Sequence, residues 1–359
     1  MDMRLSGRIV TPTGIVDGVL TAEEGTITAI ERGPIDGPEQ WIVPGFVDIH
    51  THGGGGHTFT TGDADAARAV AAFHRGHGTT TILASLVSSP FELMRDATEA
   101  YRPLVEEGVL GGVHFEGPYL AELRCGAQNP AFLRDPSIDE IVELIKIGGG
   151  AVRMMTIAPE RPGAIDAIAA LAAEGVLAAI GHTDASYEAT LAGVAAGARV
   201  ATHLFNGMRP VHHREPGPII GLLSSPSVAV ELVADGIHLH DGTLAFAANT
   251  AGVGRTVLIT DAMAAAGMPD GEYELGGQAV IVADRVARLA RDGSIAGSTL
   301  TMDAAFRQAV GAGLPITDVV RAASTTPAGL LGLPTGALEV GRRADVLTLS
   351  PDLYVTAVH

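Results

Sequence analysis

The chain alternates between short apolar or β-branched runs and longer stretches in which alanine and leucine recur at helical spacing. This alternation predicts strand–helix units whose consecutive strands pair in parallel. Eight such runs occur, at residues 46–50, 79–86, 112–116, 152–157, 177–182, 200–204, 228–234 and 256–261. Eight units of this kind predict an α/β protein whose main domain is a closed (β/α)8 barrel.

An open, doubly wound sheet is the alternative arrangement, and such a sheet normally carries a glycine-rich phosphate loop after its first strand. Gly53 to Gly56 form a run of four glycines, but they follow two histidines and no helical pattern begins directly after them. We therefore favour the barrel and interpret the glycines as a flexible active-site loop.

Short β-like segments also occur near both ends of the chain, at residues 8–10, 18–20, 26–30 and 344–349. The last segment would be isolated unless it paired with the first three. We therefore predict a small, discontinuous β-sandwich formed by residues 1–47 and 336–359, with the catalytic barrel at residues 48–335. Between about residues 267 and 297 the helical rhythm stops, which predicts a β-excursion over the barrel mouth.

Composition limits the partners and the compartment. The net charge is −18 and the basic residues are scattered, which argues against a nucleic-acid partner. The first residues lack the features of a signal peptide, and no apolar run reaches the roughly 20 residues needed to cross a bilayer. A single cysteine, Cys125, excludes a disulfide within the chain. We expect a cytoplasmic protein that binds neither membrane nor nucleic acid.

Potential metal ligands lie at the ends of the predicted strands. His50 and His52 alternate along the first strand and therefore face the same way. A lone histidine in a strand is more often structural, but single ligands recur at later strand ends, at Glu116, His182, His203 and Asp261. In a (β/α)8 barrel these ends meet at one rim. The set predicts a divalent metal site, with Zn²⁺ favoured and Fe²⁺, Co²⁺ or Mn²⁺ also compatible.

Asp261 ends the last predicted strand and can face both a metal-bound water and a substrate. A metal can lower the pKa of its bound water to about 7, and a carboxylate could then accept the proton and pass it to a leaving group. The alternative role for Asp261 is to cap the alanine-rich stretch that follows.

Seven motifs extend this interpretation to a family. They are PGFVDIHTHG (44–53), HFEGP (114–118), GHT (181–183), THLFNGM (202–208), REPG (214–217), DGIH (235–238) and TDAM (260–263). In this order they closely resemble the N-acetylglucosamine-6-phosphate deacetylases of the amidohydrolase superfamily. The resemblance implies a TIM-like hydrolase barrel that converts N-acetyl-D-glucosamine 6-phosphate to glucosamine 6-phosphate and acetate. Metal-bound hydroxide would attack the acetamide carbonyl, with Asp261 as general base and then general acid.

The resemblance also implies roles for individual residues. Glu116, His182 and His203 would hold the main metal, and the pair at 50 and 52 would complete a second site bridged by Glu116, giving one or two ions per subunit. His238 would contact the sugar and polarise the acetamide carbonyl. The 6-phosphate would be bound by Arg214 and by the backbone N–H groups of Asn206 and Gly207. Relatives are commonly homodimers, in which the arginine can come from the second subunit.

One position departs from the pattern of the family. Many relatives carry a histidine after Gly-Ala that touches the substrate, whereas this chain has Gln128 after Ala127. Glutamine can donate and accept hydrogen bonds but cannot become cationic. We therefore expect Ala127 and Gln128 to contact the substrate without supplying a positive charge.

Two other functions are compatible with a barrel of this kind. Dihydroorotases, hydantoinases and D-aminoacylases of the same superfamily often bridge two metals with a carboxylated lysine, but the only lysine here, Lys146, lies in a helix-like stretch. A catalytically inactive scaffold would be free to lose ligands, yet all six are present. His114, which shares a strand face with Glu116, is expected at most to support a ligand. The other histidines are expected to be structural or solvated, and they are His57, His74, His77, His212, His213 and His240.

Overall fold

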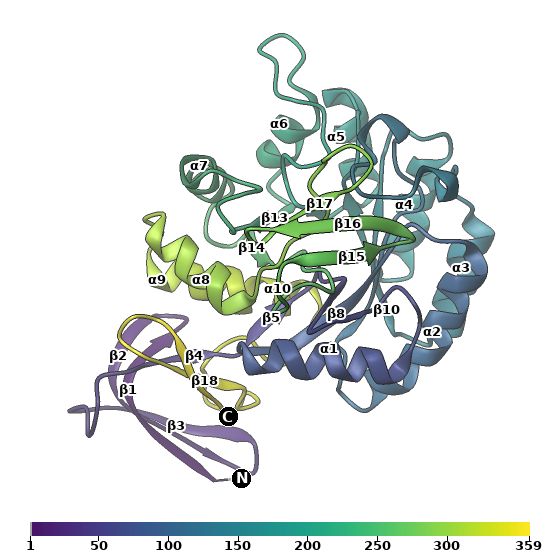
Figure 1. The fold of residues 1–359 in the computed structure, drawn as a ribbon. Coiled ribbons are helices and arrows are strands. Elements are labelled where there is room, and N and C mark those ends of the chain that lie inside the picture. The colour runs from purple at the N-terminus through teal and green to yellow at the C-terminus, as the bar shows by residue number, and fades with distance from the viewer. Residues whose placement is uncertain (1) are drawn as a thin grey trace.

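A computed structural model describes residues 2–359, and its main body is an eight-stranded sheet wound into a barrel (Figure 1). All neighbouring strands in this sheet are parallel. The strands are β5 (Phe46–Asp48), β8 (Thr79–Val87), β9 (Gly112–Glu116), β10 (Val152–Ile157), β11 (Leu177–Ile180), β12 (Val200–Ala201), β13 (Ala229–Val233) and β14 (Thr256–Ile259). The predicted fold class and all eight predicted strands are confirmed. Because both faces of these strands are largely buried, their sequences are mostly apolar.

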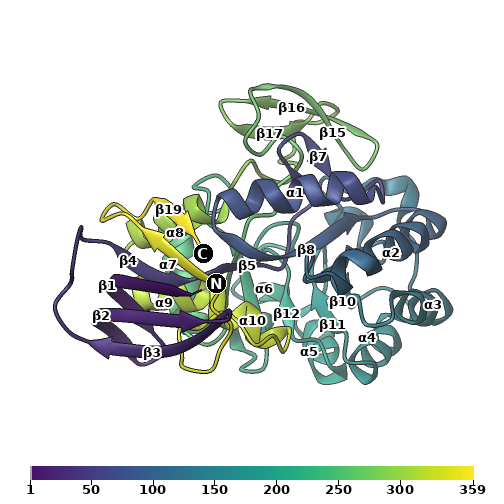
Figure 2. The ribbon, with the colours of Figure 1, turned by 90° about the horizontal axis from the view of Figure 1, so that it is seen from below.

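Helices surround the barrel (Figures 1 and 2). Several begin at polar caps: the Asp63 carboxylate accepts from two backbone N–H groups at the start of α1, and Ser137 and Ser186 cap α3 and α5. Lys146 lies in α3, as its helix-like surroundings predicted. Within residues 2–359, no helix combines the length and apolar character needed to span a membrane. The helices are α1 (Ala64–Gly76), α2 (Phe91–Glu106), α3 (Ile138–Gly148), α4 (Ala164–Ala173), α5 (Tyr187–Ala196), α6 (Gly217–Ser224), α7 (Asp241–Ala251), α8 (Met302–Gly311), α9 (Ile316–Val320) and α10 (Thr326–Leu330), with short turns η1 (Glu122–Arg124), η2 (Pro130–Phe132) and η3 (Arg321–Thr325).

Asp48 connects the first and last strands of the barrel. Its buried carboxylate accepts hydrogen bonds from the backbone N–H of Thr260 (3.3 Å) and from the Thr260 hydroxyl (2.5 Å), and the Thr51 hydroxyl donates to the same carboxylate. The N–H of Asp261 donates to the carbonyl of His50 (2.9 Å). These bonds hold the end of β5 against the end of β14, so the two candidate ligands that flank the seam are fixed relative to each other.

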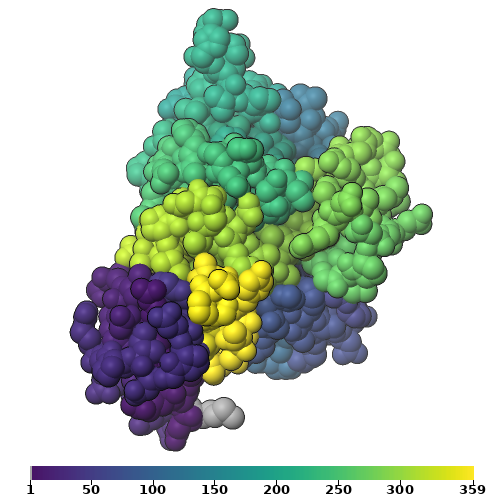
Figure 3. All heavy atoms as spheres, turned by 60° about the vertical axis from the view of Figure 1, so that its left-hand side comes forward, coloured from purple at the N-terminus to yellow at the C-terminus, as the bar shows by residue number. Residues whose placement is uncertain are grey.

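Strands from both ends of the chain meet in one six-stranded sheet, and Figure 3 shows the C-terminal segment, in yellow, against the N-terminal segment, in purple. Its small core includes Ile9, Leu20, Ile42 and Val346. The predicted pairing of the two termini is confirmed, whereas the division of the chain near residues 47 and 336 remains a proposal. The strands are β1 (Met3–Thr11), β2 (Gly14–Glu23), β3 (Thr26–Arg32), β4 (Trp41–Pro44), β18 (Val346–Leu349) and β19 (Val355–Val358).

The predicted β-excursion is a three-stranded antiparallel sheet made of β15 (Gly271–Leu275), β16 (Gln278–Ala283) and β17 (Val286–Leu289). Figure 2 shows it standing outside the ring of helices. Its inward side chains, including Leu275 and Val280, form a separate apolar cluster with Val87 and Met263 of the barrel. The excursion is therefore anchored to the barrel rim by packing.

The run from Gly53 to Gly56 is a tight hairpin rather than the flexible loop that we predicted. Strand β6 (Gly53–Gly54) pairs with β7 (His57–Thr58), and a Cβ atom added at Gly54 would lie 2.6 Å from Nε2 of His74. The same nitrogen of buried His74 hydrogen-bonds to the carbonyl of Gly53 (2.9 Å). Glycine is required here because the hairpin packs directly against α1.

His74 makes the stability of the fold sensitive to acid. Burial lowers the pKa of His74 from 6.5 to about 4, so the unfolded chain takes up this proton at a higher pH than the folded chain does. Stability from this group is complete above pH 6.5 and is lost as the pH falls towards about 4, by at most about 3 kcal/mol. We expect urea unfolding from pH 7 to pH 4 to show a steeper acid loss for the wild type than for His74→Gln. Parallel curves for the two proteins would contradict this assignment.

Candidate metal centre

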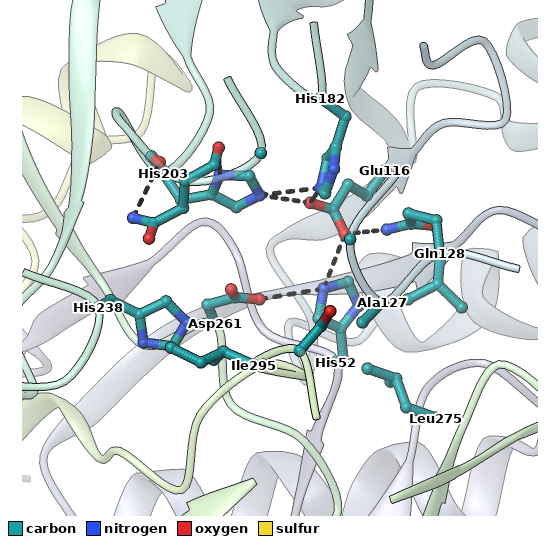
Figure 4. A pocket seen from close by; sticks show the side chains of 16 residues that line it. His52, Glu116, Ala127, Gln128, His182, His203, His238, Asp261, Leu275 and Ile295 are labelled. Atoms are coloured by element: carbon teal, nitrogen blue, oxygen red, sulfur yellow. Dashed lines mark hydrogen bonds and ion pairs between the residues drawn. The ribbon is translucent and has the colours of Figure 1, made fainter. Parts of the chain in front are cut away.

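The six predicted ligands converge at the carboxyl rim of the barrel, and Figure 4 shows all of them except His50. A first group consists of His50, His52 and Asp261, with the two imidazole Nε2 atoms 3.2 Å apart. The Nε2 atom of His52 lies 3.3 Å from Oδ1 of Asp261, and that of His50 lies 3.6 Å from the same oxygen. All three side chains are buried.

Glu116 connects this group to a second one, formed by Glu116, His182 and His203. Its Oε1 atom lies 2.9 Å from Nε2 of His182 and 2.8 Å from Nε2 of His203. Its Oε2 atom lies 3.2 Å from Nε2 of His52. One carboxylate from β9 thus reaches both groups, with Oε1 facing His182 and His203 and Oε2 facing His52, as a carboxylate that serves two ions requires.

The four imidazoles are oriented in the same way, each with Nδ1 against an oxygen outside the cluster. The partners are a carboxylate oxygen of Glu231 for His50 (3.1 Å) and backbone carbonyls for the other three: Ser85 for His52 (3.0 Å), Arg124 for His182 (2.8 Å) and Asn206 for His203 (3.1 Å). Because a protonated Nδ1 donates to each oxygen, the Nε2 lone pairs point towards one another. Lone pairs that face one another at about 3 Å fit a cation between them.

The opposite charges of the carboxylates and the imidazoles shift one another's pKa values. Burial lowers the pKa of His52, but hydrogen bonds with Asp261 and Glu116 outweigh burial and raise it to about 9. Burial also opposes protonation of His50 and His182, and the charge of Glu116 nevertheless raises both pKa values. The same attraction keeps the pKa of Glu116 low against the effect of burial. Without a metal, the cluster therefore holds protons at neutral pH.

Three candidate ligands have left-handed backbone conformations where they leave their strands. The φ angles are 46° for His182, 27° for His203 and 50° for Asp261. Such angles cost non-glycine residues energy and persist only where the surrounding structure enforces them. Here the chain turns sharply after each strand, which brings the side chain back over the barrel mouth.

A cavity of about 330 Å³ opens above the cluster and is lined by candidate ligands, by the loop after η1 and by the β-excursion. His238 also lines it, and its Nδ1 lies 2.6 Å from a carboxylate oxygen of Asp235. Burial lowers the pKa of His238, but the hydrogen bond and charge of Asp235 outweigh burial and raise it. Asp235 thus leaves Nε2 of His238 as the nitrogen available to a ligand in the cavity.

Other predicted binding residues also reach this cavity, because Ala127, Asn206 and Gly207 line it. Gln128 lines it too, but its amide is engaged: Nε2 donates to Oε2 of Glu116 (2.6 Å) and Oε1 accepts from the N–H of Ser88 (2.6 Å). The predicted substrate contact of Gln128 remains a prediction, and the observed contact is with Glu116.

Arg214 lies outside the cavity, on the exposed loop of residues 209–216 that projects at the top of Figure 3. Its guanidinium contacts the ring of His213, which is also exposed. Among the other histidines, His114 is buried between the hydroxyls of Ser85 and Thr156 and packs edge-on against His50 at 4.6 Å. That position agrees with the supporting role expected for His114.

Three carboxylates in and around the centre were not assigned from the sequence. Asp48 closes the barrel, Asp235 orients His238, and Glu231 contacts His50. Glu231 is the clearest omission, since an acidic residue inside the apolar run at residues 228–234 is a recognisable signal of a buried, paired charge.

Comparison with known proteins agrees with this geometry. Residues 41–358 match the model of the amidohydrolase family. A mutant N-acetyl-D-glucosamine-6-phosphate deacetylase from Mycobacterium smegmatis, solved in complex with N-acetyl-D-glucosamine 6-phosphate, is 44% identical with a TM-score of 0.97, over 100% of this chain and 97% of that one. An N-acetylglucosamine-6-phosphate deacetylase from Lysinibacillus sphaericus is 37% identical over 277 residues, 76% of this chain and 71% of the relative. An N-acetylgalactosamine-6-phosphate deacetylase from Escherichia coli O157:H7 is 35% identical over 362 residues, 98% and 96% of the two chains.

Loading the centre with a divalent ion should release protons. Imidazole must be neutral to bind a metal, and His52, with a pKa of about 9, is protonated at pH 7.5 when the centre is metal-free. We expect calorimetric titration of chelator-treated protein with Zn²⁺ at pH 7.5 to release at least about one proton per chain, with apparent affinity rising up to about pH 9. Equal heats in buffers of different ionisation enthalpy would contradict this expectation.

Proposed function

The chain belongs to the amidohydrolase family, and we propose that it removes the acetyl group from N-acetylglucosamine 6-phosphate, giving glucosamine 6-phosphate and acetate. The observation that carries this proposal is the sharing of Glu116 by two groups of candidate ligands at the base of a cavity. The names and coverage of the relatives supply the substrate class. The direct experiment is to measure acetate release from the phosphorylated and unphosphorylated sugars, with metal content determined on the same sample.

We assign the main metal to Glu116, His182 and His203, and a second metal to His50, His52 and Asp261, with Glu116 bridging. One or two ions per subunit fit these donors, and Zn²⁺ suits imidazole and carboxylate best, although Fe²⁺, Co²⁺ and Mn²⁺ are compatible. When bound, a divalent ion lowers the pKa of water and polarises the carbonyl of the acetamide.

Asp261 handles the proton in this proposal. Its carboxylate accepts the proton of the attacking water as the new C–O bond forms at the acetamide carbon. It then donates that proton to the nitrogen as the C–N bond breaks, so the amine leaves as a neutral group. The second proton of the water stays on the acetic acid and is released to solvent, which gives acetate. His238 donates to Asp235 from Nδ1, so it can also donate from Nε2 only as the imidazolium, the form that Asp235 favours. In that form it would donate a hydrogen bond from Nε2 to the acetamide oxygen on which negative charge develops.

The 6-phosphate is an anion and the protein carries a net charge of −18, so the phosphate needs cationic or N–H partners where it binds. Asn206 and Gly207 line the cavity and are candidates, although the N–H of Asn206 already donates to the carbonyl of His203 (3.0 Å) and would have to exchange that partner for phosphate. Ala127 and Gln128 complete the substrate-facing wall. Arg214 is exposed on a projecting loop, so we propose that a second copy of the chain supplies it in a homodimer. Exposed apolar side chains near that loop, at Val211 and Phe246, are compatible with such an interface.

The alternative substrate is N-acetylgalactosamine 6-phosphate, since a relative with that name matches almost the whole chain. Comparing kcat/KM for the two epimers would decide between the substrates. We also propose a cytoplasmic location, which a single cysteine and a sugar-phosphate substrate favour.

Replacing Asp261 by asparagine should remove the proton transfer. The ion assigned to Glu116, His182 and His203 does not need Asp261, so we expect that ion to be retained and kcat to fall by about 10²- to 10⁴-fold in the acetate-release assay. Asp284→Asn is a matched control because Asp284 is exposed and has the same φ of 50°. Full activity in Asp261→Asn would exclude the proposed acid–base role.

Replacing Arg214 by alanine should affect only the phosphorylated substrate. Loss of a charge-assisted contact to phosphate corresponds to a KM about 10- to 100-fold higher, whereas the KM for unphosphorylated N-acetylglucosamine should stay unchanged. The exposed Arg32→Ala variant on the terminal sheet serves as a control. Equal effects of Arg214→Ala on the two substrates would remove Arg214 from the phosphate site.

A further inference from the structure

We propose that Glu231 is a positioning residue that enables the group formed by His50, His52 and Asp261 to hold its metal. This inference rests on the proposed metal-dependent function and concerns one residue beneath the site. Glu231 lies on β13, its exposed fraction is 0%, and it touches the cluster from the barrel interior.

Glu231 contacts both groups of candidate ligands through a single oxygen. Oε2 accepts from Nδ1 of His50 at 3.1 Å and from the backbone N–H of His203 at 3.1 Å. The first contact fixes which nitrogen of His50 carries a proton and therefore turns the Nε2 lone pair towards the cluster. The second contact holds the turn where His203 leaves β12. One side chain thus sets the relative position of a ligand from each group.

The partner of His50 differs in kind from those of the other three imidazoles. His52, His182 and His203 donate to neutral backbone carbonyls, whereas His50 alone faces a carboxylate. A negative partner makes an imidazole a stronger electron donor to a cation than a carbonyl does. His50 is also fully buried, so solvent cannot supply this effect.

The remaining oxygen of Glu231 indicates what its charge does. Oε1 is buried and has no hydrogen-bond partner among residues 2–359. An incompletely paired carboxylate in a barrel interior is costly unless positive charge lies nearby. Three buried carboxylates, Glu116, Asp261 and Glu231, surround the four imidazoles. Because the imidazoles are neutral when they bind metal, one divalent ion leaves part of this negative charge uncompensated, and a second ion beside His50 removes it.

Glu231→Gln tests the role of the charge without removing the contacts. The amide oxygen can still accept from Nδ1 of His50 and from the N–H of His203, so the shape is retained and only the charge is lost. Thr156→Val is the matched control, because Thr156 is also buried in the barrel and bonds His114 and Thr202 rather than a candidate ligand. Unfolding midpoints of the metal-free proteins show whether each variant is folded.

The readout is Co²⁺ binding by chelator-treated protein, followed by visible absorbance and by metal analysis after dialysis, without substrate. For the wild type and Thr156→Val we expect two ions per chain. For Glu231→Gln we expect one ion to bind as in the wild type and the other about 10- to 100-fold more weakly. Two ions of wild-type affinity in Glu231→Gln, or an equal loss in Thr156→Val, would overturn the proposal. Acetate release by the wild type decides the proposed function separately, so the two ideas can fail independently.

Discussion

The structure depends on an electrostatic constraint at the carboxyl rim of the barrel. Glu116 and Asp261 are buried beside four imidazoles whose Nε2 atoms face one another, and Glu231 adds a third carboxylate beneath them. Buried groups of this kind must be balanced by protons or by metal ions. The raised pKa values of His50, His52 and His182 show that protons can balance the buried carboxylates. The converging Nε2 lone pairs provide the site where metal ions would replace those protons.

The scaffold holds these groups in place at some local energetic cost. Asp48 ties the first strand to the last, so the ligands on either side of the seam cannot separate. Left-handed backbone at His182, His203 and Asp261 turns their side chains over the mouth. Contacts to the Nδ1 atoms then select one orientation for each ring. Burial of the apolar barrel strands on both faces stabilises the fold and offsets the energetic cost of these backbone conformations.

Much of this arrangement was predictable because it follows local rules. Buried parallel strands produce continuous apolar runs, and the ligands stand where those runs end, so both the barrel and the ligand set could be predicted. Glu231 inside an apolar run signals a buried charge, but the partners of Asp48 and Glu231 could not be predicted, since they lie 212 and 181 residues away and no local pattern connects them. The glycine hairpin was misjudged because the need for glycine arises from α1, a tertiary neighbour. The motif containing Arg214 was recognisable, but its loop lies exposed outside the cavity, and no local pattern indicates that position.

We infer that six side chains from five strand ends enclose divalent metal. Anomalous X-ray diffraction from crystals of the metal-loaded protein, collected on both sides of the absorption edge of the bound element, tests it directly. We expect a strong anomalous peak between Glu116 and the Nε2 atoms of His182 and His203, with a second peak beside His50 and His52. Anomalous density confined to other parts of the molecule, with these side chains bonded only to one another, would contradict it.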